Sequence, residues 1–389
     1  MNNYAVLGLG MMGEAICFDI LSHDPDSMVF GFELNHSRRE YLEEKFLTYS
    51  ARFSTSELNL DLFDSLENHE LIDFIRDNEI KVVYGAIDYK FNEYLTRLCI
   101  KAGSSFLDLG GNPDIVESQY LHHSEAEVNK VTIVPDCGLA PGLANIIAAH
   151  GMDKFETLDS CTIRVGGLPQ NPKTILKYQQ VFSIRGLTNE YLEDAIVIED
   201  GEIKTIPSLT QLEELEFKEP FGKLEAFQTA GGTSSLPRLF KGKIRELNYK
   251  TIRYPGHCQF FQFLKNYELL SSDKIQKFNI SPREIVEHQL EKNLPKGEPD
   301  AVLVRIEITG TISGKQKKHR YELIDRLDLI SGYTAMARTT AYPISIIGIM
   351  IAQNKIMDKG VVPGEVIVPE LEFTQELLKR NITFEFIEL

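Results

Sequence analysis

Short apolar runs alternate with amphipathic segments along the first 150 residues of the chain. Runs rich in β-branched and aromatic residues, which favour β-strands, occupy residues 4–7, 28–33, 57–60, 81–87, 105–109 and 131–135. The segments between them, such as 66–76 and 92–102, place apolar residues at helical spacing. Strands that alternate with helices predict an α/β fold, so we expect a doubly wound parallel sheet over residues 1–142.

From about residue 158 the pattern changes to long β-rich runs joined by hairpin signals. Asp200-Gly201 separates DAIVI from EIKTI, and Ser313-Gly314 separates VLVRIEITGTI from HRYEL. We therefore expect a second, α+β domain with a mostly antiparallel sheet over residues 143–332. Two helices should interrupt it, one over residues 255–270 and one that Ser281-Pro282 opens with an N-cap and a first-turn proline.

After Gly332 a third helical run, TAMARTTAYPISIIGIMIAQ, leads into a tail, and its apolarity predicts that residues 333–389 return to the first domain. Its most apolar part, residues 341–353, is shorter than the roughly 20 residues that span a bilayer, so we expect a buried helix. The N-terminal MNNYAVLGLG carries no basic segment and no small-residue cleavage site, which favours a cytoplasmic protein.

Composition and charge limit the choice of partner. The 389 residues are 43% apolar, enough for a large core, and 57 acidic against 41 basic residues leave a net charge of −16. That charge repels nucleic-acid phosphates and anionic membranes, so we expect a small-molecule partner, no nucleic acid and no membrane. Five widely spaced cysteines form no CxxC pair, and no cluster of His, Cys, Asp and Glu has metal-ligand spacing. We expect free thiols and no metal.

The sequence VLGLGMMGEA places Gly8, Gly10 and Gly13 directly after the first predicted strand, where a helix should begin. Glycines at this spacing permit a tight turn and close approach of the backbone to a pyrophosphate, which the helix N-terminus attracts. Glu33 ends the second strand, twenty residues after Gly13, where an acidic side chain binds the adenosine ribose. We expect a Rossmann-type dinucleotide site; a glycine-rich turn used only for packing is the alternative.

Glu33 favours NAD, because a carboxylate repels the additional phosphate of NADP. Arg38 and Arg39 follow it, and either could bind that phosphate, which leaves NADP open. The loop AIDYKFN after the fourth strand leaves the sheet at its carboxyl edge, where ligands of such sheets bind. The expected cofactor contacts are Gly8, Gly10, Met11, Met12, Gly13, Glu33, Ala86 and Tyr89.

Several blocks of the chain resemble one known family. They read PDCGLAPGLANIIAAHG, VGGLPQNP, YQQVFSIRGLTNEY, AFQTAGGTSSLPR and YKTIRYPGH, followed by TAMARTTAYPISIIGIMI and KGVVPGEVIVPE. In order and spacing they resemble the saccharopine dehydrogenase-like superfamily, and within it the lysine 6-dehydrogenases, over nearly the whole chain. The resemblance implies that residues 143–332 serve substrate binding and oligomerisation, and that the protein is a homodimer or a higher homo-oligomer.

The resemblance also implies a reaction. It is the NAD-dependent oxidation of L-lysine at its ε-carbon to 2-aminoadipate 6-semialdehyde, which cyclises to piperideine-6-carboxylate, with release of ammonia and NADH in lysine degradation. The α-carboxylate then needs a cation and the α-ammonium an anion. A base is needed too, because an ε-ammonium of pKa about 10.4 cannot release hydride.

Arg253, in the block YKTIRYPGH, meets the first need, since a guanidinium binds a carboxylate through two hydrogen bonds. An ion pair on the face of a strand is the alternative. His257, four residues on, titrates near neutral pH and is a candidate to take the proton or to activate the water that hydrolyses the imine. The alternative is that His257 only satisfies backbone groups just inside a helix.

Asp108 and Asp136 end the fifth and sixth predicted strands at the carboxyl edge of the first sheet, where a nicotinamide would lie. Either carboxylate could bind a substrate ammonium, or act as the base once burial raises its pKa. Carboxylates at strand ends also form turns and helix caps, which is the structural alternative. We rank Asp108 first, because two glycines follow it in DLGGN.

Tyr178, Ser183 and Thr233 fall in blocks that the resemblance assigns to the substrate side, and we expect them to hydrogen-bond the amino acid. Tyr178 and Phe182 could instead share one face of a core helix.

Two other functions compete with a lysine 6-dehydrogenase. A saccharopine-type dehydrogenase or reductase acting on a secondary amine would need a second carboxylate anchor, which Arg185, Arg238 or Lys241 could supply. A non-catalytic NAD-binding module would bind NAD without turning over any amino acid.

Overall fold

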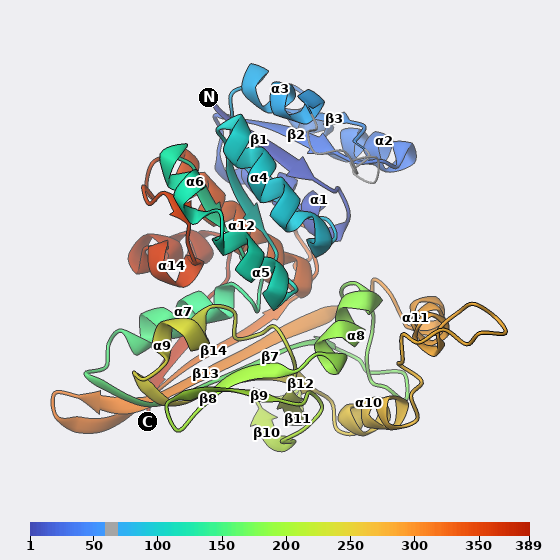
Figure 1. The fold of residues 1–389 in the computed structure, drawn as a ribbon, viewed down its shortest axis with the longest axis vertical. Helices are drawn as coiled ribbons and strands as arrows, with labels where there is room; N and C mark the ends of the chain where they lie inside the picture. The colour runs from blue at the N-terminus through green and yellow to red at the C-terminus, as the bar shows by residue number, and fades with distance from the viewer. Residues whose placement is uncertain (59–68) are drawn as a thin grey trace. The chain divides into compact units, whose positions relative to one another are not determined.

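A computed structural model describes residues 1–58 and 69–389, which form two compact units. The first unit consists of Met1–Ile146 and Ala337–Ile382, and the second of Ile147–Met336 and Thr383–Leu389. Figure 1 shows the chain coloured from its N-terminus to its C-terminus. Each unit has its own sheet and is described by itself.

The first unit is built on a seven-stranded parallel sheet (Figure 1). Its strands are β1 (Asn2–Leu7), β2 (Ser27–Phe32), β3 (Phe53–Ser56), β4 (Ile80–Gly85), β5 (Ser105–Asp108), β6 (Thr132–Val134) and β15 (Gly360–Val361). Their order is β15-β6-β5-β4-β1-β2-β3, and all neighbours are parallel. Strands one to six thus have the order 3-2-1-4-5-6 of a dinucleotide-binding sheet, which confirms the predicted fold class.

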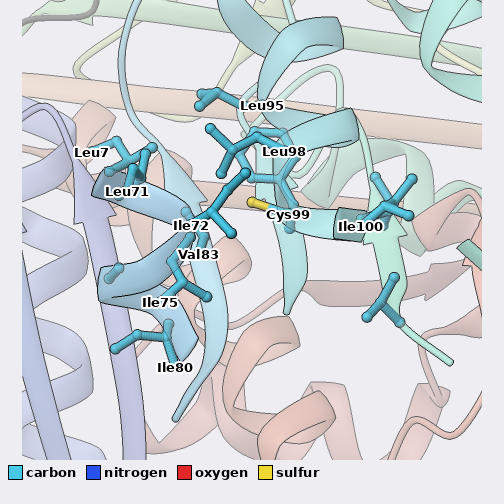
Figure 2. Close-up of a cluster of buried hydrophobic side chains, with 14 of the residues drawn as sticks. Leu7, Leu71, Ile72, Ile75, Ile80, Val83, Leu95, Leu98, Cys99 and Ile100 are labelled. Carbon is cyan, nitrogen blue, oxygen red and sulfur yellow. The ribbon is translucent and has the colours of Figure 1, made fainter. Parts of the chain in front are cut away.

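Helices follow most strands of this sheet. They are α1 (Met11–His23), α2 (His36–Lys45), α3 (His69–Asp77), α4 (Asn92–Ala102), α5 (Pro113–Tyr120), α6 (His123–Val128), α13 (Gly364–Ile367) and α14 (Glu370–Lys379), with short 3₁₀ turns η1 (Leu47–Tyr49) and η3 (Tyr89–Phe91). Helix α7 (Leu143–Met152) contains the boundary between the two units and belongs mostly to the second. On one face, Leu71 and Ile75 of α3 and Leu98 of α4 pack against Leu7 and Val83 of the sheet (Figure 2). The alternation of side chains along each strand makes this a core layer.

The long apolar helix α12 (Ala335–Ala352) belongs largely to the first unit. By length and composition it could cross a membrane, but 94% of it is buried inside the protein, as in the core helix of a soluble protein. A Cβ on its Gly348 would lie 2.1 Å from the Tyr84 hydroxyl of β4, so the absence of a side chain at Gly348 leaves room for the Tyr84 ring. The predicted buried helix is confirmed.

Two strands of the first sheet differ from the prediction. The third strand is β3 (Phe53–Ser56) and not 57–60, and residues 59–60 of that range lie outside the described residues. Alternating apolar residues in ELNLDLF suggested the wrong segment, whereas β3 buries only Phe53. Strand β15 was not predicted, because two residues carry no periodic pattern.

The second unit contains a nine-stranded mixed sheet. Its strands are β7 (Thr157–Pro169), β8 (Ala195–Glu199), β9 (Glu202–Ile206), β10 (Glu213–Phe217), β11 (Gly222–Gln228), β12 (Ile244–Arg253), β13 (Asp300–Ile312), β14 (Lys315–Arg326) and β16 (Glu385–Glu388). The main order is β10-β11-β12-β7-β13-β14-β16, with β8 pairing to β12 and β9. Among the described strands of this second sheet only the β12–β7 pair is parallel, so the prediction of a mostly antiparallel sheet is confirmed.

The two predicted hairpin turns and the predicted helix N-cap of this unit are confirmed too. Asp200-Gly201 and Ser313-Gly314 have positive φ at both positions and join β8 to β9 and β13 to β14, as two-residue hairpin turns require. Ser281 caps α11 in a capping box with Glu284. The helices are α8 (Ile184–Leu192), α9 (Leu236–Phe240), α10 (His257–Asn266) and α11 (Pro282–Asn293).

The prediction that the whole of residues 333–389 returns to the first domain is wrong at its end. Residues Thr383–Leu389 belong to the second unit, where β16 pairs antiparallel with β14. The apolar pattern indicated where α12 packs, but β16 is four residues long and mostly exposed, so it carries no apolar signal of its own.

Candidate active site

The glycine-rich loop joins β1 to the N-terminus of α1 in the first unit. Gly8 has φ of 86°, a conformation that residues with a Cβ rarely adopt, and a Cβ on Gly13 would lie 1.8 Å from the Gly8 carbonyl oxygen. A Cβ on Gly10 would meet nothing within 4 Å, and as the N-cap of α1 it provides no side-chain hydrogen bond. Met11 and Met12 begin the helix. The helix N-terminus therefore keeps open backbone for an anion, which fits a pyrophosphate.

Glu33 follows β2 and turns back to the glycine-rich loop. Its Oε2 accepts a hydrogen bond from the Leu9 amide at 3.1 Å, and its Oε1 accepts one from the Asn35 amide at 2.9 Å. Each carboxylate oxygen keeps further acceptor capacity. The side chain is thus fixed where the dinucleotide fingerprint places the ribose-binding acid.

Arg38 and Arg39 both bond to the chain near Glu33, and Arg38 does so at the glycine-rich loop itself. Arg38 donates from Nε to the Leu9 carbonyl at 2.8 Å and forms an ion pair with Glu14. Arg39 donates to the main chain after β2 and pairs with Glu57 at 3.1 Å. These contacts leave Arg38 Nη1 and Arg39 Nε without an acceptor among the described residues, so either arginine could meet a 2′-phosphate without losing them.

Ala86 and Tyr89 lie in the loop after β4. The Ala86 amide donates to the Leu7 carbonyl at 2.9 Å, and a Cβ on Gly8 would lie 2.6 Å from the Ala86 carbonyl oxygen. A Cβ on Gly111 would lie 3.0 Å from the Tyr89 ring. The loops after β1, β4 and β5 therefore meet at the carboxyl edge of the sheet, which is the ligand edge of this fold.

Asp108 and Asp136 lie together at the same edge. Asp108 is completely buried; its Oδ1 accepts from the Gly110 amide at 2.8 Å and the Asp136 amide at 3.3 Å, and its Oδ2 accepts from Gln119 at 2.7 Å. Burial raises the pKa of Asp108 although these hydrogen bonds oppose the shift. These contacts match the turn-forming alternative for Asp108. Asp136 is half-buried, with φ of 61°, and a Cβ on Gly110 would lie 2.0 Å from its Oδ1.

Arg253 ends β12 in the second unit and is 3% exposed. Its Nε donates to the Tyr191 hydroxyl at 2.9 Å, and its Nη1 donates to the Ile252 carbonyl at 2.9 Å. The guanidinium carbon lies 5.1 Å from the centre of the Tyr178 ring. Among the described residues no carboxylate forms an ion pair with Arg253, and its Nη2 donates to no group. The strand-face ion pair offered as the alternative is therefore absent from the described part of the chain.

His257 begins α10 and is 2% exposed. Its Nδ1 lies 3.0 Å from the Leu176 carbonyl oxygen and its Nε2 lies 3.1 Å from the Tyr191 hydroxyl. Burial, together with the nearby Arg253 charge, lowers the pKa of His257 to about 3. Both nitrogens are engaged and the ring is a weak base, so the geometry does not favour the predicted role in proton removal.

The three predicted substrate-side residues are placed differently. Tyr178 packs edge-on against His257, with ring centres 5.4 Å apart, in the loop before α8, so a shared helix face with Phe182 is wrong. Ser183 is the N-cap of α8, and its Oγ accepts from the Gly186 amide at 3.2 Å. Thr233 donates to the Ile196 carbonyl at 3.0 Å. The structure thus brings Tyr178 to Arg253 and His257, whereas the Ser183 hydroxyl bonds to the main chain of its own helix and the Thr233 hydroxyl to the main chain of β8.

A family model described as the saccharopine dehydrogenase C-terminal domain matches residues 138–382, more than half of the chain. The protein belongs to the saccharopine dehydrogenase family. The resemblance seen in the sequence blocks is confirmed at the level of the family.

The fold of the protein is also found among solved structures. Over 100% of both chains the protein is similar to apo histidine-tagged saccharopine dehydrogenase (L-Glu forming) from Saccharomyces cerevisiae, with a TM-score of 0.81 and 17% identity, which establishes a shared fold. A meso-dapdh mutant with DAP from Clostridium tetani E88 has a TM-score of 0.45 and 12% identity over 97% of this chain and 99% of that one. A probable dehydrogenase from Thermotoga maritima has a TM-score of 0.42 and 12% identity over 97% and 94%. The last two likenesses are too weak to build on. Family and fold together support an NAD(P)-dependent dehydrogenase.

Two residues of this family member were missed by the sequence analysis, Glu190 and Tyr191 at the end of α8. Tyr191 is fully buried and bonds to both Arg253 and His257. Glu190 is half-buried, its carboxylate accepts no hydrogen bond from the described residues, and burial raises its pKa to about 7 against the opposing Arg253 charge. Tyr191 follows Leu187 at helical spacing and reads as an ordinary core aromatic, while nothing in the sequence separates Glu190 from the nearby Glu193.

Proposed function

We propose that this dehydrogenase oxidises the ε-carbon of L-lysine with NAD, yielding 2-aminoadipate 6-semialdehyde, which cyclises to piperideine-6-carboxylate, together with ammonia and NADH. One observation carries the substrate class: the guanidinium of Arg253 is buried, stacked on Tyr178, and without an anionic hydrogen-bond partner among the described residues. Burying a cation costs free energy unless an anion pairs with it. A substrate carboxylate can pair with Arg253 through the guanidinium donors that remain free.

Glu190 supplies the second charge that an amino acid requires. It is the carboxylate whose charge is coupled to Arg253, and its raised pKa lets it hold or accept a proton near neutral pH. A carboxylate beside the anchoring guanidinium suits the α-ammonium of an amino acid. Asp108 and Asp136 remain candidates for the base that deprotonates the ε-ammonium, whereas His257 is the weaker candidate.

The expected cofactor is NAD. NAD held by the glycine-rich loop through its pyrophosphate would accept the hydride from the ε-carbon of the substrate. Glu33 is fixed at the loop by the Leu9 and Asn35 amides, and a carboxylate at this position disfavours a 2′-phosphate. Arg38 pairs with Glu14 and Arg39 with Glu57, so the charge of each guanidinium is already balanced within the chain, which also supports NAD over NADP.

The saccharopine-type alternative needs a second carboxylate anchor. Arg185 is paired with Glu287 at 3.2 Å and Lys241 with Glu202 at 2.9 Å, both with largely exposed basic side chains, and Arg238 is also engaged. Because these side chains already have partners, a substrate with a single α-carboxylate is favoured. A homo-oligomer in the cytoplasm stays part of the proposal.

The deciding experiment mixes the purified protein with NAD or NADP and L-lysine, saccharopine, ornithine or 1,5-diaminopentane, which is lysine without its carboxylate. We expect reduction of NAD with L-lysine, a preference for NAD over NADP, and little reaction with the diamine. Nicotinamide reduction is followed by absorbance. Reduction with saccharopine alone would favour the alternative, and tight NAD binding without any turnover would favour the non-catalytic module.

The carboxylate anchor is tested separately with Arg253→Lys, which keeps the charge and loses the fork. We expect its KM for L-lysine to rise by about 10–100-fold while its Kd for NAD is unchanged, because a charge-assisted hydrogen bond to a buried site is lost. Arg245→Lys is the matched control, since Arg245 is exposed near the start of the same strand. An unchanged KM in Arg253→Lys would remove Arg253 from the site.

A further inference from the structure

Arg253, Tyr191 and His257 form one directed chain of hydrogen bonds that ends at the Leu176 carbonyl. A carbonyl oxygen only accepts, so the His257 nitrogen 3.0 Å from it, Nδ1, carries the proton. A neutral imidazole has one N–H, and Nε2 is therefore the acceptor. The Tyr191 hydroxyl, 3.1 Å away, must donate to Nε2, and its oxygen then accepts from Arg253 Nε at 2.9 Å.

The surroundings of the imidazole keep it neutral. The groups that face it are the Arg253 cation, the hydroxyl-bearing rings of Tyr178 and Tyr191, and the apolar rings of Phe227 and Phe261. Phe261 stacks on the imidazole with ring centres 4.9 Å apart. No carboxylate of the described residues contacts the ring, so nothing there would stabilise a second positive charge beside Arg253.

These hydrogen bonds determine which donors of the Arg253 guanidinium remain free. Tyr191 occupies Nε, and the Ile252 carbonyl occupies one hydrogen of Nη1. The remaining donors are the second hydrogen of Nη1 and the two hydrogens of Nη2. Two of them, one on each nitrogen, form the end-on fork that binds both oxygens of a carboxylate.

We infer that Tyr191, and His257 through Tyr191, are positioning residues that hold Arg253 with its Nη1–Nη2 edge turned to the substrate carboxylate. The inference rests on the proposed function for the identity of that substrate. It gives His257 a part in substrate affinity and none in proton transfer, which distinguishes it from the general base expected from the sequence.

Two substitutions of His257 separate these roles. The amide of His257→Gln reaches the position of Nε2 and can accept from Tyr191, whereas the amide of His257→Asn reaches only the position of Nδ1 and keeps the bond to Leu176. With NAD saturating, we expect His257→Gln to keep a KM for L-lysine within about threefold of the wild type. We expect His257→Asn and Tyr191→Phe to raise KM by about 10–100-fold, with kcat within about threefold in all three variants.

A general base at His257 predicts a different result. Both substitutions would then lower kcat by about 100-fold or more at unchanged KM, and an ionisation would disappear from the pH profile of kcat. That outcome would overturn the inference, as would a KM for Tyr191→Phe equal to that of the wild type. The wild-type pH profile should contain no ionisation that either His257 substitution removes.

A second measurement does not depend on the substrate. The unfolding free energies of Tyr191→Phe, Arg253→Met and the double variant form a cycle, in which positioning predicts a non-additive effect and independent packing predicts additivity. If the wild type oxidises no amino acid, the proposed function fails and this cycle alone decides the inference. Additive effects would then refute it, and coupling between the two side chains would support it.

Discussion

At the scale of single residues, Glu190 makes the stability of the second unit depend on pH. Its pKa is raised from 4.5 to about 7, mainly by burial. The folded state therefore holds the proton on Glu190 more tightly than the unfolded state does. The resulting contribution to the free energy of unfolding is fully present below pH 4.5 and is lost as the pH rises to about 7. At pH 8 we expect Glu190→Gln to be more stable than the wild type by about 2 kcal/mol, and at pH 4 the difference should disappear.

The comparison is made by urea unfolding at several pH values between 4 and 8, with hydrogen exchange of α8 to locate the change in the second unit. Glu214→Gln is the matched control, because Glu214 is an exposed carboxylate on β10. A difference between Glu190→Gln and the wild type that does not vary with pH would show that the carboxyl of Glu190 is not desolvated.

Residues whose role depends on the main chain could be predicted from the sequence, and those whose role depends on distant packing could not. Gly8 and Gly13 are required by the course of their own loop, so their spacing reveals them. Arg253 was predicted through the family resemblance. The role proposed for Tyr191 depends on a hydrogen bond from a strand some sixty positions later in the chain, and a buried tyrosine in an amphipathic helix looks the same in the sequence with or without that partner.

At the scale of helices and strands, the N-termini of α11 and α12 show the same limit of prediction from the sequence. Ser281 caps α11 with a local capping box, which the sequence shows directly. The first amides of α12 are capped by Asp300 of β13, which accepts from the Ala335 amide at 2.7 Å and from the Met336 amide at 2.9 Å. A cap that comes from another strand leaves no signature beside the helix it serves.

We expect Asp300→Ala to lower the unfolding free energy by about 2–3 kcal/mol, more than the roughly 1 kcal/mol expected for Ser281→Ala. Asp300 is fully buried, so its removal takes a carboxylate acceptor away from two amides where water has no ready access. Urea unfolding of both variants provides the measurement, and Asp300→Asn, which retains one acceptor oxygen, should lie between Asp300→Ala and the wild type. Equal losses in the two alanine variants would contradict a special role for the buried cap.

At the scale of the whole molecule, the first unit is closed by a buried ion pair between the two ends of the chain. Asp19 of α1 is fully buried and receives Arg380 Nε at 2.8 Å, and Ser345 of α12 also donates to it. Arg380 is held in turn by Glu376 at 2.8 Å. The apolarity of α12 predicted that the chain returns to the first unit, but not this pair, because its members are 361 positions apart.

The pair is tested by Arg380→Met, which leaves the Asp19 carboxylate buried without its arginine partner. We expect a loss of about 3–5 kcal/mol near pH 7, and a partial recovery in Asp19→Asn/Arg380→Met, which no longer buries the Asp19 charge. Burial alone would raise the pKa of Asp19, but Arg380 and His23 hold it below its usual value of 3.8. The contribution of the ion pair to the free energy of unfolding is therefore present above pH 3.8 and is lost as the pH falls through the pKa of Asp19 in the folded state. Acid should thus reduce the difference in unfolding free energy between Arg380→Met and the wild type. Urea unfolding, with hydrogen exchange of α1 and α14 to assign the loss to the first unit, measures both effects. A double variant no more stable than Arg380→Met would mean that the uncompensated carboxylate is not the cause of the loss.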